Sequence, residues 1–392
     1  MIICSIKNCR LCGSSELDTI FDFGNFPLAG IYYDKIEEKT EITAPMTLIR
    51  CKKCGHVQLK ETCDPEIYQD YSFSGQQIPS YCKYMEIFSN QLVEKFKISE
   101  KKIFEVGASD GFLLKLLRDD GKNFVDGIEP STKLCLSAEK KNVHLYNDYF
   151  NKKFYDKIEK KFDCIIVRHV LEHIDDLNSF FYGLKKILED DGFLFIEVPY
   201  LKKTLSNSLF SNFFHEHINY FTLKTLSELA ANYGFELLTF QENEIHGGSI
   251  FTVFKKTFNA TRLNFDDEEK VVLKDLQNFK IDFSNYLIKL NNKIKTFKNE
   301  EIFHGYGAAQ RTFNILKFLN LDYKKVPIIY DLNKNLQGKY LNYFHSKIIS
   351  PEDMLEYNPS TVIIFASSYE DEIAHLIKEK IGSKVKILSM QI

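Results

Sequence analysis

Two copies of a Cys-x-x-Cys-Gly pattern place the strongest constraint on how this chain folds. The first is "CRLCG", with Cys9 and Cys12, and the second is "CKKCG", with Cys51 and Cys54. In each copy two thiolates on one tight turn can reach the same ion, and the following glycine suits a backbone position of positive φ. Four thiolates form a closed tetrahedral set, which is typical of a structural zinc site. We therefore predict a zinc ion with a lobe larger than a compact zinc finger folded around it.

The other cysteines and the overall charge restrict the protein class. Of nine cysteines, five lack a partner at metal-ligand spacing and are interpreted as inert fillers. The N-terminus has no apolar run of signal-peptide length, and no segment is apolar for long enough to cross a bilayer. We therefore expect a cytoplasmic protein with no membrane partner. The net charge of −3, without a long basic block, argues against a nucleic-acid partner.

Length and pattern predict three domains, because 392 residues exceed one ordinary domain. Residues 1–76 are turn-rich and carry the paired cysteines, and residues 77–256 alternate apolar strands with helices. Residues 257–392 begin with a charged, packed helix over 266–295 and then alternate again. Alternation of this kind predicts a parallel sheet wrapped by helices. The predicted fold class is α/β, with a Rossmann-like sheet in the middle, a small Cys4 zinc-binding lobe before it and a second Rossmann-like α/β domain after it.

The stretch "IFEVGASDGFLLKLL" predicts a strand, a glycine-containing turn and a helix. Gly107 and Gly111 let the backbone approach a ligand, and Asp110 can accept a hydrogen bond. The spacing matches neither the dinucleotide fingerprint nor the P-loop. Glu129, at the end of the second strand, can bind both ribose hydroxyls of a nucleoside, and Asp148 after the third can reach an adenine edge. Each acid alone also fits a solvated turn, but the ordered series favours a nucleoside site.

Four segments of the middle block, "EVGASDG", "GIEP", "NDYF" and "RHVLEHIDD", resemble the successive motifs of class I S-adenosylmethionine-dependent methyltransferases. The resemblance implies a mostly parallel seven-stranded sheet with the cofactor at the carboxyl ends of its first strands. It also implies these contacts with S-adenosylmethionine: Glu105, Gly107, Asp110, Gly111, Glu129, Pro130, Asp148 and His169.

A closer resemblance covers nearly the whole chain. The Cys4 block with "CGHVQL", then "HEH", "HGGS", "GYGAAQRT" and "YDLNKNLQGKYL", in this order, resemble the three-domain sugar C-methyltransferases. The family's substrate is a nucleotide-linked 4-keto-deoxysugar, which is methylated at C3 while the outer domains hold it over the cofactor. The resemblance implies these substrate contacts: His215, His246, Gly247, Gly305, Tyr306, Gly307 and Arg311. Arg311 could meet a phosphate.

The stretch "HEHINYF" follows the fifth predicted strand and ends at Thr222, a candidate helix N-cap. Loops at the carboxyl ends of parallel strands face bound ligands, so we expect His215, Glu216 and His217 to lie over the cofactor. Methyl transfer to carbon needs a base, and histidine suits that task near neutral pH. A neighbouring carboxylate can orient the imidazole, and the enolate oxygen needs a donor.

By resemblance, His217 corresponds to the general base of the family, Glu216 to its catalytic partner and Tyr71 to a tyrosine from the first domain. The family tends to carry a tyrosine just before HEH, where this chain has Phe214. That departure removes one hydroxyl and puts the oxyanion contact, or the details of the substrate, in question.

Three alternatives stay open. A metal site at HEH needs a third ligand, and the motif offers none. His215 also fits a satisfied packing residue, and Glu172 and His173 of "RHVLEHIDD" are interpreted as structural residues. The same scaffold could methylate oxygen or nitrogen on a nucleotide sugar, or it could bind a nucleotide sugar without turnover. The sequence gives neither the nucleotide, the sugar and its stereochemistry nor the oligomeric state.

Overall fold

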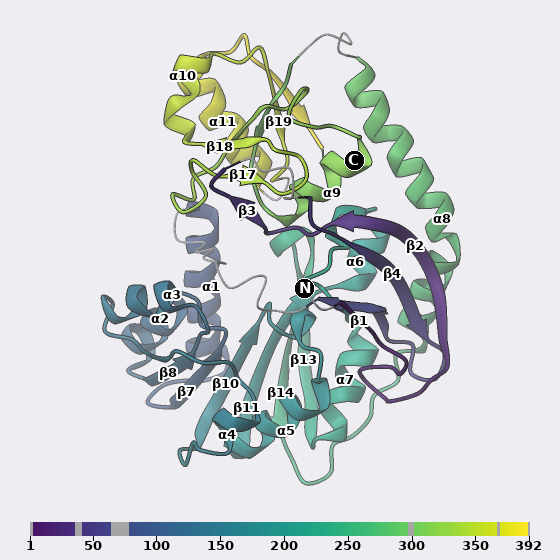
Figure 1. The fold of residues 1–392 in the computed structure, drawn as a ribbon. Helices are drawn as coiled ribbons and strands as arrows, with labels where there is room; N and C mark the ends of the chain where they lie inside the picture. The colour runs from purple at the N-terminus through teal and green to yellow at the C-terminus, as the bar shows by residue number, and fades with distance from the viewer. Residues whose placement is uncertain (1–2, 36–40, 64–77, 297–301, 367–368, 391–392) are drawn as a thin grey trace.

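The computed structural model of the protein describes residues 3–35, 41–63, 78–296, 302–366 and 369–390. Figure 1 shows the central sheet at the bottom, the C-terminal domain at the top, and the N-terminal strands and one long helix along the side that joins them. The predicted catalytic Tyr71 lies outside the described residues.

The central sheet has seven strands in the order β13-β14-β11-β10-β7-β8-β9. Pairing from β11 through β10, β7 and β8 to β9 is parallel, whereas β14 is antiparallel to both its neighbours. The strands are β7 (Lys102–Val106), β8 (Phe124–Ile128), β9 (His144–Tyr146), β10 (Phe162–Arg168), β11 (Leu188–Pro199), β13 (Phe235–Asn243) and β14 (Ser249–Lys256). The mostly parallel seven-stranded sheet that the resemblance implied is therefore present.

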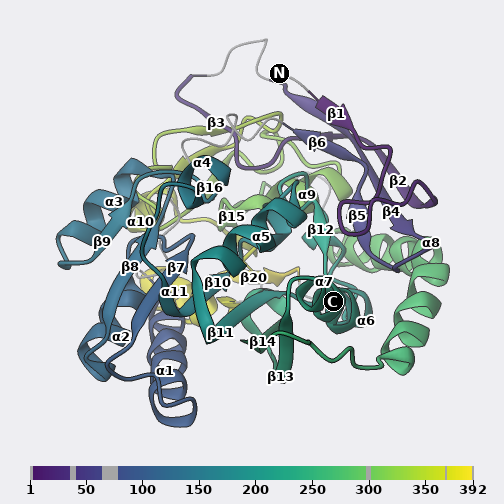
Figure 2. The same ribbon diagram turned by 90° about the horizontal axis from the view of Figure 1, so that it is seen from below.

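Helices cover both faces of this sheet because its inner strands are apolar on both sides. Ile103 of β7 and Ile166 of β10 pack with the helices on one face, and Phe104 and Val167 pack with those on the other. The first face carries α1 (Pro79–Lys95), α2 (Phe112–Gly121) and α3 (Thr132–Glu139). The second carries α4 (Lys152–Tyr155), α5 (Leu177–Ile187) and α7 (Leu223–Asn232), as seen from below in Figure 2. Thr222 is the N-cap of α7, as predicted.

The N-terminal lobe contains a four-stranded antiparallel sheet in the order β12-β5-β4-β2. Its strands are β2 (Leu17–Pro27), β4 (Thr43–Cys51), β5 (Val57–Leu59) and β12 (Asn219–Tyr220), and a separate pair joins β1 (Ile3–Ser5) to β6 (Glu61–Cys63). Strand β12 follows the HEH motif, so the chain returns from the central domain to complete the lobe. The motif is thereby held beside the N-terminal sheet.

The C-terminal domain has a second seven-stranded sheet, in the order β20-β19-β15-β16-β18-β17-β3. Its strands are β15 (His304–Tyr306), β16 (Ile328–Tyr330), β17 (Tyr340–Leu341), β18 (Lys347–Ile349), β19 (Thr361–Ile364) and β20 (Lys386–Ser389), with helices α9 (Gln310–Phe318), α10 (Met354–Tyr357) and α11 (Glu370–Ile381). The edge strand β3 (Tyr32–Tyr33) comes from the N-terminal lobe and pairs with β17. Buried Asn342 reinforces this junction, because its side chain hydrogen-bonds the backbone of Leu28 and Ile42.

Helix α8 (Asp266–Lys295) spans the stretch for which the sequence predicts a packed helix. Its buried face enters a core shared by the N-terminal sheet, the segment before HEH and the C-terminal domain. Within this core the ring of Phe279 lies 5.0 Å from that of Phe210 and 5.4 Å from those of Phe213 and Phe21, measured between centroids. Among the described residues, every helix, including the short α6 (Leu201–Ser206), is too short or too polar to span a bilayer.

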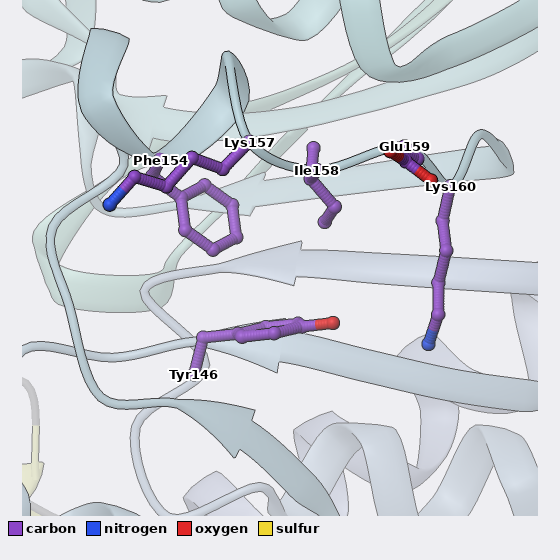
Figure 3. A pocket seen from close by; sticks show the side chains of 6 residues that line it. All are labelled: Tyr146, Phe154, Lys157, Ile158, Glu159 and Lys160. Carbon is purple, nitrogen blue, oxygen red and sulfur yellow. The ribbon is translucent and has the colours of Figure 1, made fainter.

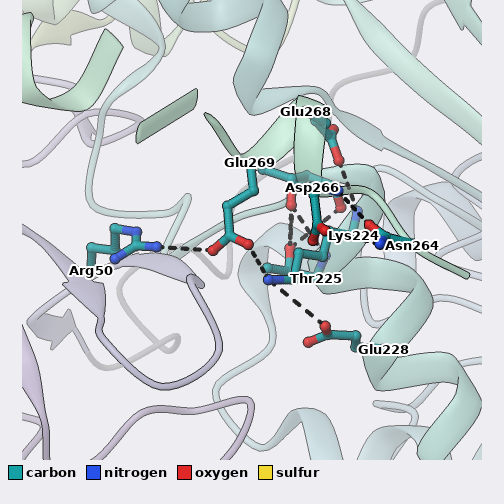
Figure 4. A network of polar contacts seen from close by, with 9 residues as sticks. Arg50, Lys224, Thr225, Glu228, Asn264, Asp266, Glu268 and Glu269 are labelled. Carbon is teal, nitrogen blue, oxygen red and sulfur yellow. Dashed lines mark hydrogen bonds and ion pairs between the residues drawn. The ribbon is translucent and has the colours of Figure 1, made fainter. Parts of the chain in front are cut away.

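The first turn of α8 binds the start of α7 through two neighbouring glutamates (Figure 4). The carboxylate of Glu268 accepts hydrogen bonds from the backbone N–H groups of Leu223 and Lys224, at 2.9 and 3.0 Å, and from the hydroxyl of Tyr200 at 2.6 Å. An anion at a helix N-terminus satisfies free N–H groups and opposes the helix dipole. Glu269 pairs with Arg50 of the N-terminal lobe and with Lys224. Three parts of the chain therefore meet at one turn.

We predict that Glu268→Ala lowers the free energy of unfolding by about 2 kcal/mol, because it leaves N–H groups of α7 without their acceptor. The matched control is Asp267→Ala, whose side chain is 99% exposed, for which we expect a change below about 0.5 kcal/mol. Urea unfolding followed by circular dichroism gives both values. Equal losses in the two variants would contradict the assigned contact.

Candidate active site

The four predicted zinc ligands come together at one point. The Sγ atoms of Cys9 and Cys54 are 3.7 Å apart, those of Cys12 and Cys51 are 3.6 Å apart, and all four lie within 4.8 Å of one another. Sulfur atoms at the corners of a tetrahedron are about 3.8 Å apart when each lies about 2.3 Å from zinc. The hydrogen bond between Cys9 and Cys54 lowers the pKa of Cys9 to about 4 and raises the pKa of Cys54, so the two sulfurs share one proton when no metal is bound. The set fits a structural zinc ion.

Three predicted cofactor acids gather at the carboxyl ends of β7 and β8. Glu105 is buried, and its Oε2 has no hydrogen-bond partner among the described residues. Burial raises the pKa of Glu105 to about 8; Arg168 opposes the shift, and Asp110 and Glu129 add to it. The carboxylate of Glu129 accepts from the backbone N–H groups of Ser109 and Ser131, at 3.0 and 2.9 Å, which fixes its orientation. Three clustered carboxyl groups fit a cofactor that carries ribose hydroxyls and a cationic sulfonium.

The two glycines of the loop have no room for a side chain. Gly107 and Gly111 adopt φ values of 71° and 72°. A Cβ on Gly107 would lie 2.5 Å from Val170, and one on Gly111 would lie 3.0 Å from Ala138. The loop therefore depends on glycine for both its conformation and its packing.

Pro130 and Asp148 lie nearer the surface than the three clustered acids. Both are exposed, and Asp148 accepts a hydrogen bond from the backbone N–H of Tyr149. A surface hollow of about 450 Å³ opens beside Tyr146 (Figure 3). Its other lining residues are Phe154 of α4 and 157–160, between α4 and β10, and none of the predicted cofactor residues lines it. We therefore do not assign it to the cofactor.

His169 follows β10 and lies between two carboxylates. Its backbone adopts φ 52°, and its ring nitrogens are 3.5 Å from oxygens of Glu172 and Glu197. Burial disfavours a charged imidazole, but the two carboxylates outweigh it and raise the pKa of His169 to about 9. The ring also meets that of His246 edge-on, at 4.6 Å between centroids. His169 therefore carries a positive charge at neutral pH.

Sequence reasoning missed the group around Glu197 at the end of β11. Its carboxylate accepts from Arg168 at 2.8 Å, from Asn243 at 2.7 Å and from the hydroxyl of Tyr84. The guanidinium of Arg168 also lies over the ring of Phe88, 4.8 Å from its centroid. The available signal was an acid at the end of the fifth strand, in "FLFIEVP". This network fixes α1 to the edge of the sheet where the acids gather.

The three residues of HEH diverge. His215 is buried, and its Nε2 donates to the carbonyl oxygens of Ala44 and Pro45 in β4, at 3.2 and 3.1 Å. Burial lowers the pKa of His215 to about 4, so it is a neutral donor that binds the N-terminal lobe. Its predicted contact with substrate remains a prediction. Glu216 instead points toward α9, where its carboxylate accepts from Gln310 at 3.2 and 3.4 Å.

His217 lies among other histidines and an aromatic ring. Its ring centroid is 4.0 Å from that of Phe214, which occupies the place of the family tyrosine, and 5.0 Å from that of His173. Burial, helped by nearby His173 and Arg311, lowers the pKa of His217 well below its usual value. The imidazole is therefore neutral and able to accept a proton. Sequence reasoning missed both Gln310 and His173 as neighbours of this motif.

The predicted substrate residues divide into two groups. Arg311 donates to the backbone oxygen of His246, so the start of α9 reaches the "HGGS" loop. Gly247, with φ 86°, lies against the same guanidinium. Burial lowers the pKa of Arg311 to about 10, which leaves it charged at neutral pH.

Close packing explains why both glycines of "GYG" lack a side chain. A Cβ on Gly305 would lie 2.6 Å from Phe365, and one on Gly307 would lie 2.8 Å from Ala366. Tyr306 between them is buried, and its hydroxyl has no partner among the described residues. Burial raises its pKa, so the hydroxyl stays protonated. Contact of these residues with substrate remains a prediction.

We predict that Cys51→Ser lowers bound zinc from about one ion per chain to well under half, because three thiolates leave the tetrahedral set open. Mass spectrometry of metal content after dialysis gives the value. The control is exposed Cys4→Ser, which should keep its zinc. Equal zinc content in the two variants would rule out the four-cysteine site.

We predict a pH-dependent contribution of His169 to stability. Its pKa is raised from 6.5 to about 9 in the folded chain, so the contribution is fully present below pH 6.5 and is lost as pH rises through 9. By linkage, this contribution to the free energy of unfolding is about 3 kcal/mol. Asparagine tolerates positive φ, so His169→Asn removes the charge without straining the backbone. Urea unfolding from pH 6 to pH 10 should show a steeper decline in wild type than in the variant, because Glu105 and Glu216 titrate in both. Parallel curves would refute the raised pKa.

Comparisons with known proteins find three consecutive domain matches in the chain. A model described as a zinc binding domain matches residues 9–68, a methyltransferase domain matches 81–239, and a C-methyltransferase C-terminal domain matches 244–389. The chain is 25% identical to C-methyltransferase NovU of Streptomyces niveus over 96% of its own length and 94% of that protein.

Solved structures of methyltransferases match about half of the chain. Magnesium protoporphyrin IX methyltransferase of Synechocystis is 15% identical, over 49% of this chain and 92% of that one, with a TM-score of 0.38. A possible histamine N-methyltransferase of Thermotoga maritima is 18% identical, over 46% and 94%, with a TM-score of 0.37. The three consecutive domain matches and the nearly full-length relative show that the chain is an S-adenosylmethionine-dependent C-methyltransferase.

Proposed function

We propose that the enzyme methylates C3 of a nucleotide-linked 4-keto-deoxysugar. In this reaction His217 removes the C3 proton, the C4 ketone becomes an enolate, and the resulting carbon nucleophile accepts the methyl group. S-adenosylmethionine, when bound, supplies that methyl group from a cationic sulfur. This nucleotide-linked sugar is the substrate that the sequence resemblance implies. We also propose that the domain boundaries lie after residues 76 and 256.

The observation that carries the proposal is the contact between Glu216 and Gln310. Nε2 of Gln310, in the first turn of α9, donates to Oε2 of Glu216 at 3.2 Å. This contact joins the HEH motif, at the carboxyl ends of the central strands, to the C-terminal domain. The N-terminus of a helix suits a phosphate, and Arg311 in the same turn is cationic. A nucleotide diphosphate bound there would place its sugar near His217, between the two domains.

The charge states support base-assisted enolisation. His217 is neutral, so a ring nitrogen has a lone pair for the C3 proton at neutral pH, although the lowered pKa makes it a weaker base than an ordinary histidine. Burial raises the pKa of Glu216 to about 8, although the hydrogen bond from Gln310 opposes the shift. A protonated Glu216 can donate to the oxygen of the enolate, which needs a donor as negative charge develops. Phe214 has no hydroxyl for that task, and Tyr71 remains a predicted third catalytic residue.

The test is exchange of the C3 proton in deuterium oxide without the methyl donor, followed by turnover with it, both read by mass spectrometry. For His217→Asn we expect both rates to fall by about 10²–10⁴, the usual contribution of a general base. The control is His144→Ala, an exposed histidine of the same domain, which should keep both rates. Methylation without C3 exchange in wild type would instead favour an oxygen or nitrogen acceptor. Full exchange in His217→Asn would refute the assigned base.

A further inference from the structure

Glu172 and His173 lie beside His217, although the sequence separates them widely. One ligand atom from each of the three residues lies within 4.8 Å of the others. Glu172 and His173 belong to the short helix η3 (Leu171–His173) after β10, whereas His217 belongs to the HEH loop. The two segments are bonded directly, because the N–H of Ile218 donates to the backbone oxygen of Glu172 at 2.8 Å. The HEH loop therefore contributes one candidate ligand, His217, and η3 contributes the other two.

The side chain of Glu172 is suited to a cation. The residue is 1% exposed, and its Oε2 has no hydrogen-bond partner among the described residues. A buried carboxylate oxygen without a donor is costly, and coordination of a metal ion removes that cost. The other oxygen is 3.5 Å from His169, so it is engaged elsewhere.

His173 is held in one tautomer by a backbone contact. Its Nδ1 is 2.8 Å from the backbone oxygen of Glu216, to which it donates. This bond fixes the tautomer and leaves the lone pair on Nε2, the arrangement commonly found behind metal-bound histidines. The ring of His173 meets the ring of His217 at 71°, so the two imidazoles do not stack.

We propose that Glu172, His173 and His217 bind a divalent first-row transition-metal ion, and that this ion inhibits methyl transfer. Two imidazoles and one carboxylate suit Zn²⁺, Co²⁺ or Ni²⁺, whereas Mg²⁺ and Ca²⁺ prefer oxygen ligands alone. Three protein ligands leave a position open to solvent, unlike the four-cysteine site. The guanidinium of Arg311 near His217 opposes the ion, so it binds more weakly than the structural zinc.

Inhibition follows from the lone pair of His217. A nitrogen that binds a metal ion cannot also accept the C3 proton, so the loaded site lacks the proposed base. This half of the inference rests on the proposed function, whereas metal binding itself does not. The two are therefore measured separately.

The binding experiment titrates Co²⁺ into the full chain with zinc already in its four-cysteine site. Calorimetry and visible absorption should report one further ion per chain, without the charge-transfer band of thiolate ligation. For Glu172→Gln and His173→Ala we expect affinity to fall at least about tenfold, while His144→Ala keeps it. Retained zinc content and S-adenosylmethionine binding verify that each variant is folded. Equal Co²⁺ affinity in wild type and His173→Ala would overturn the site.

The activity experiment measures C3 exchange without S-adenosylmethionine at rising Co²⁺. Exchange in wild type should fall with the same midpoint as the calorimetric titration. Exchange that persists at saturating Co²⁺ would overturn the inhibition while leaving the binding result intact. Absence of exchange before any metal is added would instead contradict the proposed function.

Discussion

Two buried side chains hold the segment 210–217 from opposite sides, and the whole candidate site depends on them. Asn314 of α9 donates to the backbone oxygens of Ser211 and Phe213, at 2.9 and 2.6 Å, and His215 donates to β4 of the N-terminal lobe. Buried backbone oxygens need such donors, and removing one leaves an unsatisfied polar group that costs about 1–3 kcal/mol. The position of Glu216 and His217 is therefore set by both flanking domains as well as by the central sheet.

Features with a local cause could be predicted from the sequence. The paired cysteines converge because each pair lies on one tight turn, and the parallel strands appear because each is a short apolar run before a helix. Helix α8 has the predicted bounds, since its apolar residues recur at helical spacing from acidic start to basic end. Thr222 caps α7 because a threonine before an apolar periodic run satisfies the free N–H groups.

Features made by distant segments could not be predicted. Nothing in "HEH" shows that His215 turns toward β4 while Glu216 turns toward Gln310, because those partners lie 170 and 94 residues away. The proximity of His173 to His217 depends on how η3 packs against the HEH loop. The same holds for Glu197, whose partners come from α1, β10 and β13. Residue type predicted chemistry at each position, but only the fold determines which groups meet.

The pairing of β3 with β17 joins two segments that are synthesised far apart in time. Tyr32 and Tyr33 leave the ribosome early, yet their partners Tyr340 and Leu341 are made about three hundred residues later. Until then β3 carries free backbone groups, which invite pairing with other chains. This assembly step therefore awaits nearly complete synthesis, and it is a step at which two nascent copies could exchange β3.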